Sequence, residues 1–111
     1  MAGDLRERIQ LREFVATGTD ALLAPTGIWR DKGAPVRAAK RDLSDRERAA
    51  VDAWRQTTLA RFTLRASAFS RTISREDRIL HRGVEWAIVG ITAIGDGTAW
   101  LQLTCETGDL P

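Results

Sequence analysis

The residues best suited to chemistry gather around the only histidine of the chain. Glu76 and Asp77 precede His81 in the stretch SREDRILHRGVEWAIVGI (residues 74–91), a grouping that would suit general acid–base catalysis. In an extended strand, however, the step from Asp77 to His81 spans about 13 Å, so these groups do not converge. We therefore interpret the acidic pair as a turn that enters a strand, and His81 as a residue beside a hairpin turn.

The only cysteine, Cys105, is the second candidate for chemistry, as a nucleophile. Its pattern places it on a predicted core face with no histidine nearby, where a cysteine behaves as a small hydrophobic residue. One cysteine and one histidine are too few for an ordinary zinc site. The GDG tripeptide at 95–97 lacks the remaining glycines of a phosphate-binding loop. We therefore predict no catalytic, cofactor-binding or metal-binding residues, and no enzymatic activity.

The basic residues indicate binding rather than catalysis. The chain has a net charge of +2, and residues 83–111 hold four acidic groups and no Lys or Arg. Basic side chains recur through residues 30–48, where they would suit contact with phosphate backbones, without reading of the base sequence. These candidates are Arg30, Lys32, Arg37, Lys40, Arg41, Arg46 and Arg48. The alternatives are a solvated surface, or stacking of copies with positive against negative charge.

The elements that must position these groups follow mostly the two-residue period of β-strands. Alternation predicts strands around residues 9–12, around Trp29, at 35–41 and at 58–66. The stretch ATGTDALLAPTG, residues 16–27, is rich in Gly, Thr and Pro and is predicted to be a loop. The expected fold is therefore mostly β, a small antiparallel β-barrel or sandwich.

One helix is predicted, at about 44–56, within LSDRERAAVDAWRQ. Ser44 is a suitable N-cap and Glu47 completes a capping box. We expect a single domain, 1–111, with a long loop-plus-helix insertion at about 30–57. No apolar run approaches the length of a membrane span, and the first residues lack the apolar core of a signal peptide.

Two hairpins are predicted towards the end of the chain, with turns at 82–83 and 96–97. Two-residue turns give the pairs Ile79–Trp86, His81–Val84, Ile88–Cys105 and Ile94–Ala99. The resulting core face holds Ile79, Trp86, Ile88, Ile94, Leu101, Leu103 and Cys105. The opposite face is also largely apolar, which predicts cover by the helix or by another subunit. The candidates for a subunit interface are Trp29, Trp54, Val89, Ile91 and Trp100, although a place in the core is the favoured alternative for each tryptophan.

The order of these motifs resembles that of a known family. LRERIQL, GIW, LSDRERAAVDA, RFTLRAS, ISREDRILHRGVEWAIVGI and LQLTCE follow one another over about residues 4–106. This series is similar to the head-tail joining, or head-closure ("stopper"), family of long-tailed bacteriophages and phage-like particles. The matching positions are Leu5, Arg8, Ile9, Ser44, Glu47, Arg65, Asp77, Arg78, Ile79, Gly83, Trp86, Ile88 and Glu106. The second tryptophan of the family, near Val36 and Arg37, has no counterpart here.

The resemblance implies a structural role in the neck of a virion or phage-like particle, after synthesis in the host cytoplasm. Such a β-barrel would form a homo-oligomeric ring of six or twelve copies beneath the portal or adaptor ring, with a tail terminator or tail tube below. The ring would seal the packaged DNA, touch it without sequence specificity, and contact no membrane. The basic segment would face the DNA channel or the adaptor. The alternative is a small nucleic-acid-binding β-barrel without enzymatic activity, whose binding would weaken steeply with salt.

Overall fold

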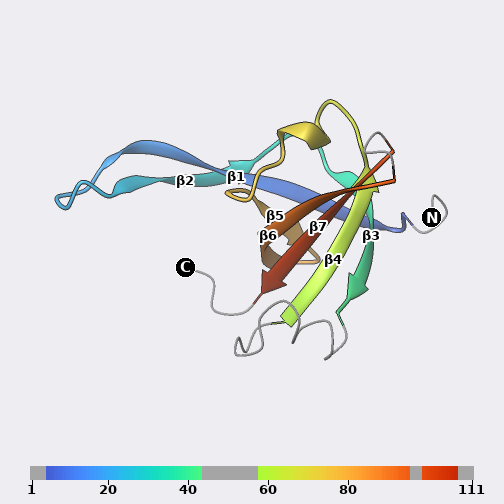
Figure 1. Cartoon of the computed structure of the whole chain (residues 1–111). Helices are drawn as coiled ribbons and strands as arrows, with labels where there is room; N and C mark the ends of the chain where they lie inside the picture. Colours follow the sequence, from blue (N-terminus) through green and yellow to red (C-terminus); the bar gives the residue numbers. More distant parts are fainter. Residues whose placement is uncertain (1–4, 44–57, 96–98, 108–111) are drawn as a thin grey trace.

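Seven antiparallel strands account for most of the structure, a computed structural model that describes residues 5–43, 58–95 and 99–107 (Figure 1). The predicted class, mostly β and antiparallel, is confirmed. Within these residues the one helical element is a short 3-10 turn, η2. In chain order the elements are β1 (Glu7–Thr19), β2 (Pro25–Asp31), β3 (Val36–Asp42), β4 (Thr58–Arg65), η2 (Ser70–Thr72), β5 (Arg78–His81), β6 (Val84–Ile94) and β7 (Trp100–Thr107).

Six of these strands close into a barrel, because β1 pairs along both of its edges. One edge pairs with β3, where Ile9 lies opposite Val36, and the other edge pairs with β5, where Leu11 lies opposite Ile79. The ladder then runs from β3 through β4, β7 and β6 back to β5. Closure leaves no free edge around this ring of strands, so the barrel can fold without a neighbour at its sides.

The second half of β1 leaves the barrel and pairs only with β2, which forms a projecting two-stranded arm (Figure 1). We call residues 13–30 the arm. The predicted loop at 16–27 was therefore wrong: both sides of it are strand, and only residues 20–24 turn the chain. The loop-like composition has a structural cause at Gly27, where an added Cβ would lie 2.1 Å from the carbonyl oxygen of Val15. The strands approach too closely there for any side chain.

The interior of the barrel is filled by residues that alternate along the strands. Phe62 on β4 is fully buried and packs edge-on against Trp86, with ring centroids 5.6 Å apart. The core includes five members of the predicted core face, namely Ile79, Trp86, Ile88, Leu103 and Cys105. Leu101 packs against this cluster while partly exposed.

The hairpin between β5 and β6 has the predicted register. Ile79 lies opposite Trp86 and His81 lies opposite Val84. Arg82 and Gly83 both have positive φ, at 50° and 81°, as a two-residue turn of the primed type requires. The left-handed backbone thus bears out the turn assigned at 82–83.

The pairing of β6 with β7 is correct at one end and shifted by one residue at the other. Ile88 lies opposite Cys105 as predicted, but Ile94 lies opposite Trp100 and not Ala99. A β-bulge between Ile88 and Gly90 inserts one residue and reverses which side chains face the core beyond it. Ile94 is therefore corrected from the core face to the face of Trp100. Ile91, predicted on the opposite face, instead packs against the core.

The predicted insertion at about 30–57 is only partly described. Its first part is not a loop, because β2 ends at Asp31 and residues 36–42 form β3, as their alternation predicted. The predicted helix at 44–56 lies outside the described residues, as do Trp54 and the turn at 96–97. No described helix has the length and hydropathy that crossing a membrane requires.

Candidate functional site

The acidic residues that precede the histidine in the sequence do not contact it, and the charged groups here make structural contacts instead. The Nε2 atom of His81 lies 2.7 Å from Oε1 of Glu7, which joins the start of β1 to the β5–β6 hairpin. The hydrogen bond from His81 lowers the pKa of Glu7, and the charge of Arg82 adds to this effect. Asp77 instead accepts a hydrogen bond from the backbone N–H of Ser74. Asp77 and His81 thus have separate partners, as their interpretation as a turn and a hairpin end predicted.

Cys105 lies in the core, as predicted. Its side chain has no solvent exposure, and burial raises the pKa of the thiol far above its usual range. The reactive thiolate is therefore strongly disfavoured. Among the described residues no three His, Cys, Asp or Glu side chains come together in a group that would hold a metal ion.

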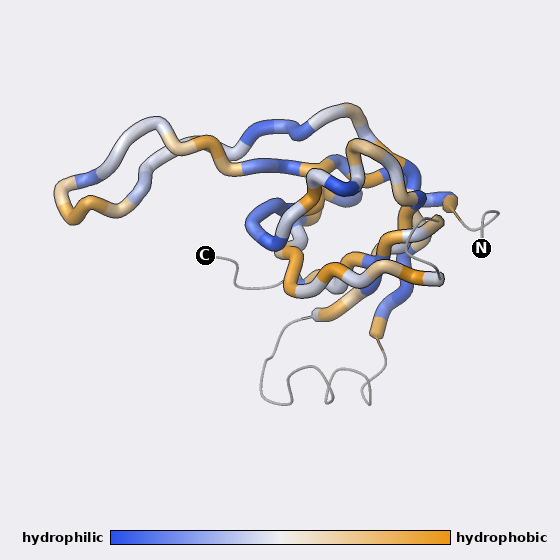
Figure 2. Tube along the Cα trace, turned by 45° about the horizontal axis from the view of Figure 1, so that its top comes forward, coloured by the Kyte–Doolittle hydropathy of each residue, from blue (hydrophilic) through white to orange (hydrophobic). Residues whose placement is uncertain are grey.

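The arm carries the most exposed apolar side chains of the described structure. At its tip, Leu22 and Leu23 are 88% and 80% exposed, and along its length Ile28 and Phe14 are 59% and 41% exposed. The tip also stands out as hydrophobic in the hydropathy view (Figure 2). An apolar surface on a projecting element is typical of a site that another protein covers.

The tip has a fixed shape in spite of its exposure. Oδ1 of Asp20 accepts hydrogen bonds from the backbone N–H groups of Leu22 and Ala24, at 2.8 and 2.9 Å. The backbone N–H of Asp20 donates to the carbonyl oxygen of Ala24 at 2.9 Å. Leu23 takes a left-handed conformation with φ of 64°, which is unusual for a leucine. The two leucines are therefore presented by an ordered turn.

The base of the arm is stiffened by aromatic and ionic contacts. Phe14 and Trp29 pack with ring centroids 5.6 Å apart, and the guanidinium of Arg78 lies 4.3 Å from the Trp29 ring. Cross-strand ion pairs join Arg12 to Asp31 and Arg30 to Glu13. Trp29, a predicted interface residue, is thus half-buried within the arm itself. Arg30, a predicted basic contact, is exposed and ion-paired on the same element.

Two other members of the predicted basic set have structural partners. Nζ of Lys32 lies 2.7 Å from Oδ2 of Asp77, in a pair whose side chains are only 17% and 7% exposed. Lys40 pairs with Asp42 at 3.1 Å and lies 5.2 Å from the centroid of the Trp86 ring. The charge of Lys32 is thus engaged at the base of the arm, and its contact with DNA or an adaptor stays a prediction. Lys40 lies on the inward side of β3, since Ala38 of the same side is in the core.

The two other described members of the predicted basic set, Arg37 and Arg41, point outward from β3. Their neighbours across the ladder are also arginines, because Arg8 lies opposite Arg37 and Arg61 lies opposite Arg41. We call the outward arginines of β1, β3 and β4, with Arg6 just before β1, the arginine face: Arg6, Arg8, Arg37, Arg41, Arg61 and Arg65. Arg61 is half-buried, because the outward residues Leu59 and Thr63 on either side of it are buried. The described outward positions of these strands within the barrel include no acidic residue. Arg46 and Arg48 lie outside the described residues.

Sequence reasoning missed four members of the arginine face. Arg8 lies on the first strand and Arg6 just before it, whereas Arg61 and Arg65 belong to the fourth, so their proximity depends on strand order. The signal that was available is the alternation of each arginine with a core residue, as in RFTLR. Opposed like charges such as Arg8 and Arg37 weaken a sheet, so folding alone does not account for them.

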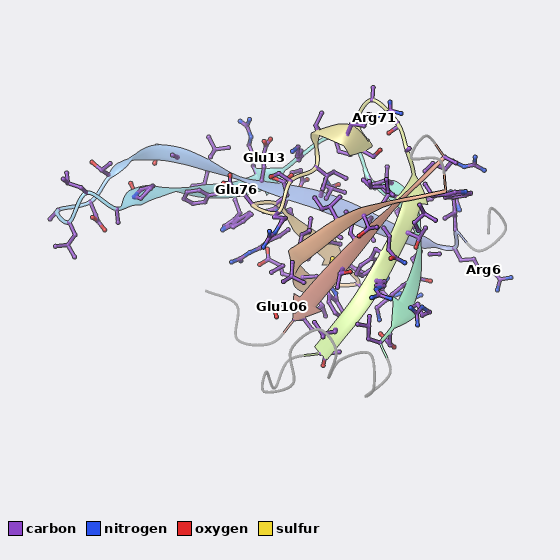
Figure 3. The ribbon with its side chains drawn as sticks, viewed as in Figure 1. Arg6, Glu13, Arg71, Glu76 and Glu106 are labelled. Carbon is purple, nitrogen blue, oxygen red and sulfur yellow. The ribbon has the colours of Figure 1, made fainter. Side chains whose placement is uncertain are left out.

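Two pockets lie along β1, one beside its middle and the other beside its N-terminal end. One, of about 430 Å³ at the base of the arm, is lined by aromatic and acidic residues: Glu13, Phe14, Trp29, Glu76 and Asp77. The other, of about 260 Å³, we call the far pocket, and its lining is Leu5, Val36, Arg37, Leu64, Arg65 and Ser67. Figure 3 shows Glu13 and Glu76 together near the arm and Arg6 at the opposite end of the molecule. The lining of the pocket at the base of the arm is therefore acidic, and that of the far pocket is basic.

Known proteins share both the sequence pattern and the fold. A family model described as phage head completion protein matches residues 1–108. The chain belongs to the phage head completion protein family. This confirms the resemblance, which rested on the hairpin at 74–91 more than on any other segment. No curated protein shows a significant match.

Two solved structures share the fold of this head completion protein. The solution structure of protein SF1141 from Shigella flexneri 2a superposes with a TM-score of 0.73 at 22% identity, covering 98% of this chain and 97% of that one. A chain from the virion of a native gene transfer agent particle superposes with a TM-score of 0.63 at 15% identity, covering 92% and 93%.

Family membership gives the protein a structural role at the phage head, within the virion or a phage-like particle, among other head and tail proteins. Such proteins are in general not enzymes. Of the predicted interface residues, Trp100 is half-buried with the guanidinium of Arg65 5.2 Å from its ring centroid, and Val89 is half-buried at the bulge. Among the described residues, the arm and the exposed arginines Arg8 and Arg37 are candidate surfaces for partners.

Proposed function

We propose that this protein is a subunit of the ring that closes the head at its neck, sealing the packaged DNA and linking the portal or adaptor to the tail. The observation that carries the proposal is the arm. Its exposed leucines extend from a barrel that already encloses a complete core, so the arm does not serve the core. A closed barrel with a preformed apolar projection suits a subunit that folds first and assembles afterwards.

A ring of six or twelve copies would bury the arms and bring the other half-buried apolar positions against neighbours. The described members of the predicted interface are all accessible in part: Trp29, Val89, Ile91 and Trp100. The portal or adaptor would contact one rim of the ring, and a tail terminator or tail tube the other. Homo-oligomers with closed symmetry are the usual form of such assemblies.

The arginine face would give the ring its contact with DNA. Arg8 and Arg37 are exposed and directly opposed on neighbouring strands, which concentrates positive charge on one side of the barrel. Arginines spread over a barrel surface suit contact with phosphate oxygens, and contacts to phosphate carry no sequence information. The contact would therefore be independent of DNA sequence.

The test of this function is assembly of particles without the protein. Heads that lack it are expected to lose their packaged DNA and to remain untailed in electron micrographs. Supplying the wild-type chain in trans should restore both properties. Particles that retain DNA and attach tails in its absence would overturn the proposal.

The arginine face also favours the second candidate function, a small nucleic-acid-binding barrel that acts outside a neck ring. That function predicts that the purified protein binds duplex DNA and loses affinity steeply as salt is raised. The charge-reversal variant Arg8→Glu/Arg37→Glu should then lose about two phosphate contacts. The plot of log affinity against log salt should become less steep by about 2, since each lost contact lowers its slope by about 1. Binding that is flat with salt would rule this candidate out.

A further inference from the structure

The tip of the arm and the far pocket have complementary chemistry. The tip presents Leu22 and Leu23, which are almost fully exposed, and the second carboxylate oxygen of Asp20, whose Oδ1 already accepts two backbone hydrogen bonds. The far pocket has mostly apolar walls, and Arg37 and Arg65 are the two charged residues of its lining. The tip is thus apolar with one negative charge, and the pocket is apolar with two positively charged residues in its lining.

The far pocket is too small for an ordinary small-molecule site. Its volume of about 260 Å³ lies below the range of roughly 300–1,000 Å³ that such sites occupy. Its residues come from three places in the chain, since Leu5 precedes β1, Val36 begins β3 and Ser67 follows β4. The pocket is therefore a feature of the assembled barrel, with a size that suits one or two protein side chains.

A single molecule does not bring its own tip to its own pocket. The two features lie at opposite ends of β1, which at about 3.3 Å per residue is roughly 40 Å long. The longest dimension of the molecule is 48 Å, and the arm points away from the N-terminal end of β1 (Figure 1). The contacts at the base of the arm, between Phe14 and Trp29 and between Lys32 and Asp77, oppose folding back.

We propose that the arm tip of one copy inserts into the far pocket of a second copy of this chain. Leu22 and Leu23 would lie against Leu5 and Val36, and the carboxylate of Asp20 would face Arg37 and Arg65. A contact between two different surfaces of identical chains is heterologous, and repetition of it produces a closed ring when the rotation is suitable. The inference rests on the proposed neck ring and identifies the surfaces that would build it.

Because the tip is already ordered, docking would cost little conformational entropy. Its turn is already ordered by the hydrogen bonds of Asp20, so docking would immobilise few additional bonds. The same order explains why two leucines stay exposed in the free molecule and are not collapsed onto the arm.

Site-directed disulfide formation in assembled particles tests the contact. Two single-cysteine replacements are made, Leu22→Cys at the tip and Ser67→Cys at the pocket, both at exposed positions. The native Cys105 is fully buried and does not compete. Particles grown with both variants together are oxidised, and their cross-linked products are identified by mass spectrometry. We expect a dimer joined between positions 22 and 67.

The controls separate this contact from other arrangements. Each variant alone should give no dimer, because a heterologous contact does not bring two tips or two pockets together. Thr92→Cys, exposed on β6, replaces the pocket cysteine as the matched control and should give no dimer with Leu22→Cys. A dimer joined through two copies of position 22, a cross-link from the tip to a different virion protein, or no product in mixed particles would each overturn the inference.

Failure here is distinguishable from failure of the proposed function. If particles without the protein lose DNA and tails but the 22–67 dimer does not form, the neck function stands and the arm has another partner. If such particles remain filled and tailed, the neck function fails, whatever the cross-link shows.

Discussion

The barrel and the arm are built from the same strand, β1, but they treat apolar side chains in opposite ways. Within the barrel, Ile9 and Leu11 have no solvent exposure and face a filled interior. Within the arm, a two-stranded ribbon has no interior, so Phe14 and Ile28 stay exposed. Two-stranded hairpins are at best marginally stable in water by themselves. The barrel is therefore stabilised by apolar side chains buried within one molecule, whereas the apolar side chains of the arm are exposed and available to a partner.

The difference between the barrel and the arm is tested most directly by removing one large apolar side chain from each region. Phe62→Ala should lower the free energy of unfolding by about 3–5 kcal/mol, because Phe62 is fully buried against Trp86. Leu22→Ala should change it by about 0.5 kcal/mol or less, since Leu22 is 88% exposed. Urea unfolding of the two purified variants measures both. Equal losses would show that the arm belongs to the folding core.

What could be predicted from the sequence follows the same division between regions. The β5–β6 hairpin was predicted with its register, because Arg82-Gly83 fixes the turn locally. The arm was missed because the segment around Gly27 has the composition of a loop. Gly27 is nevertheless part of a strand, and it is a glycine because β1 approaches its backbone too closely for a side chain. The one local mark of the bulge after Ile88 is Gly90, a glycine within the strand, and because it was not interpreted as a bulge the faces of Ile91 and Ile94 were reversed.

The candidate site was less predictable than the fold, because it depends on which strands become neighbours. Arg37 was singled out by its place in a basic segment, but Arg8 lies opposite it only through the β1–β3 pairing. Lys32 was grouped with Arg37 by proximity in sequence, although Asp77, its partner, lies 45 residues away. Charge runs locate basic residues, and only the topology separates exposed ones from ion-paired ones.

The junction of the two regions gives the second largest expected effect. Lys32→Met should destabilise the protein by about 2–3 kcal/mol, because it leaves the nearly buried carboxylate of Asp77 without its cation. The matched variant Arg37→Met removes an exposed charge and should stay within about 0.5 kcal/mol of wild type. Thermal unfolding compares them. A smaller loss for Lys32→Met than for Arg37→Met would contradict the assignment of Lys32 as structural.

A change confined to the arm should be local. Gly27→Ala places a Cβ 2.1 Å from the carbonyl oxygen of Val15 and should open the β1–β2 pairing at a cost of about 1–3 kcal/mol. Gly18→Ala is the control, because its Cβ would meet only Thr26 Oγ1, at 3.7 Å. Hydrogen exchange should rise at residues 13–19 and 25–30 in the first variant alone. Increased exchange throughout the barrel would show that the regions are not separable.

The smallest expected effect concerns pH and lies in the barrel. The pKa of Glu7 is lowered in the folded state, chiefly by the hydrogen bond from His81, so its contribution is present above the ordinary value of about 4.5. That contribution is lost as the pH falls through the lower, folded-state pKa. Glu7→Gln should be less stable than wild type near pH 7 and converge with it in acid. Urea midpoints that stay equally separated down to about pH 3 would contradict this cause.

The central claim is that the arm serves assembly in the neck and not the fold. The variant Leu22→Ser/Leu23→Asn keeps a residue that tolerates positive φ at position 23 and removes both exposed leucines. The purified variant is predicted to unfold at the wild-type temperature. Particles that depend on it should show at least about a tenfold drop in DNA-filled, tailed forms by electron microscopy, as expected when central anchors of an interface are lost. Filled and tailed particles in wild-type numbers would contradict the claim.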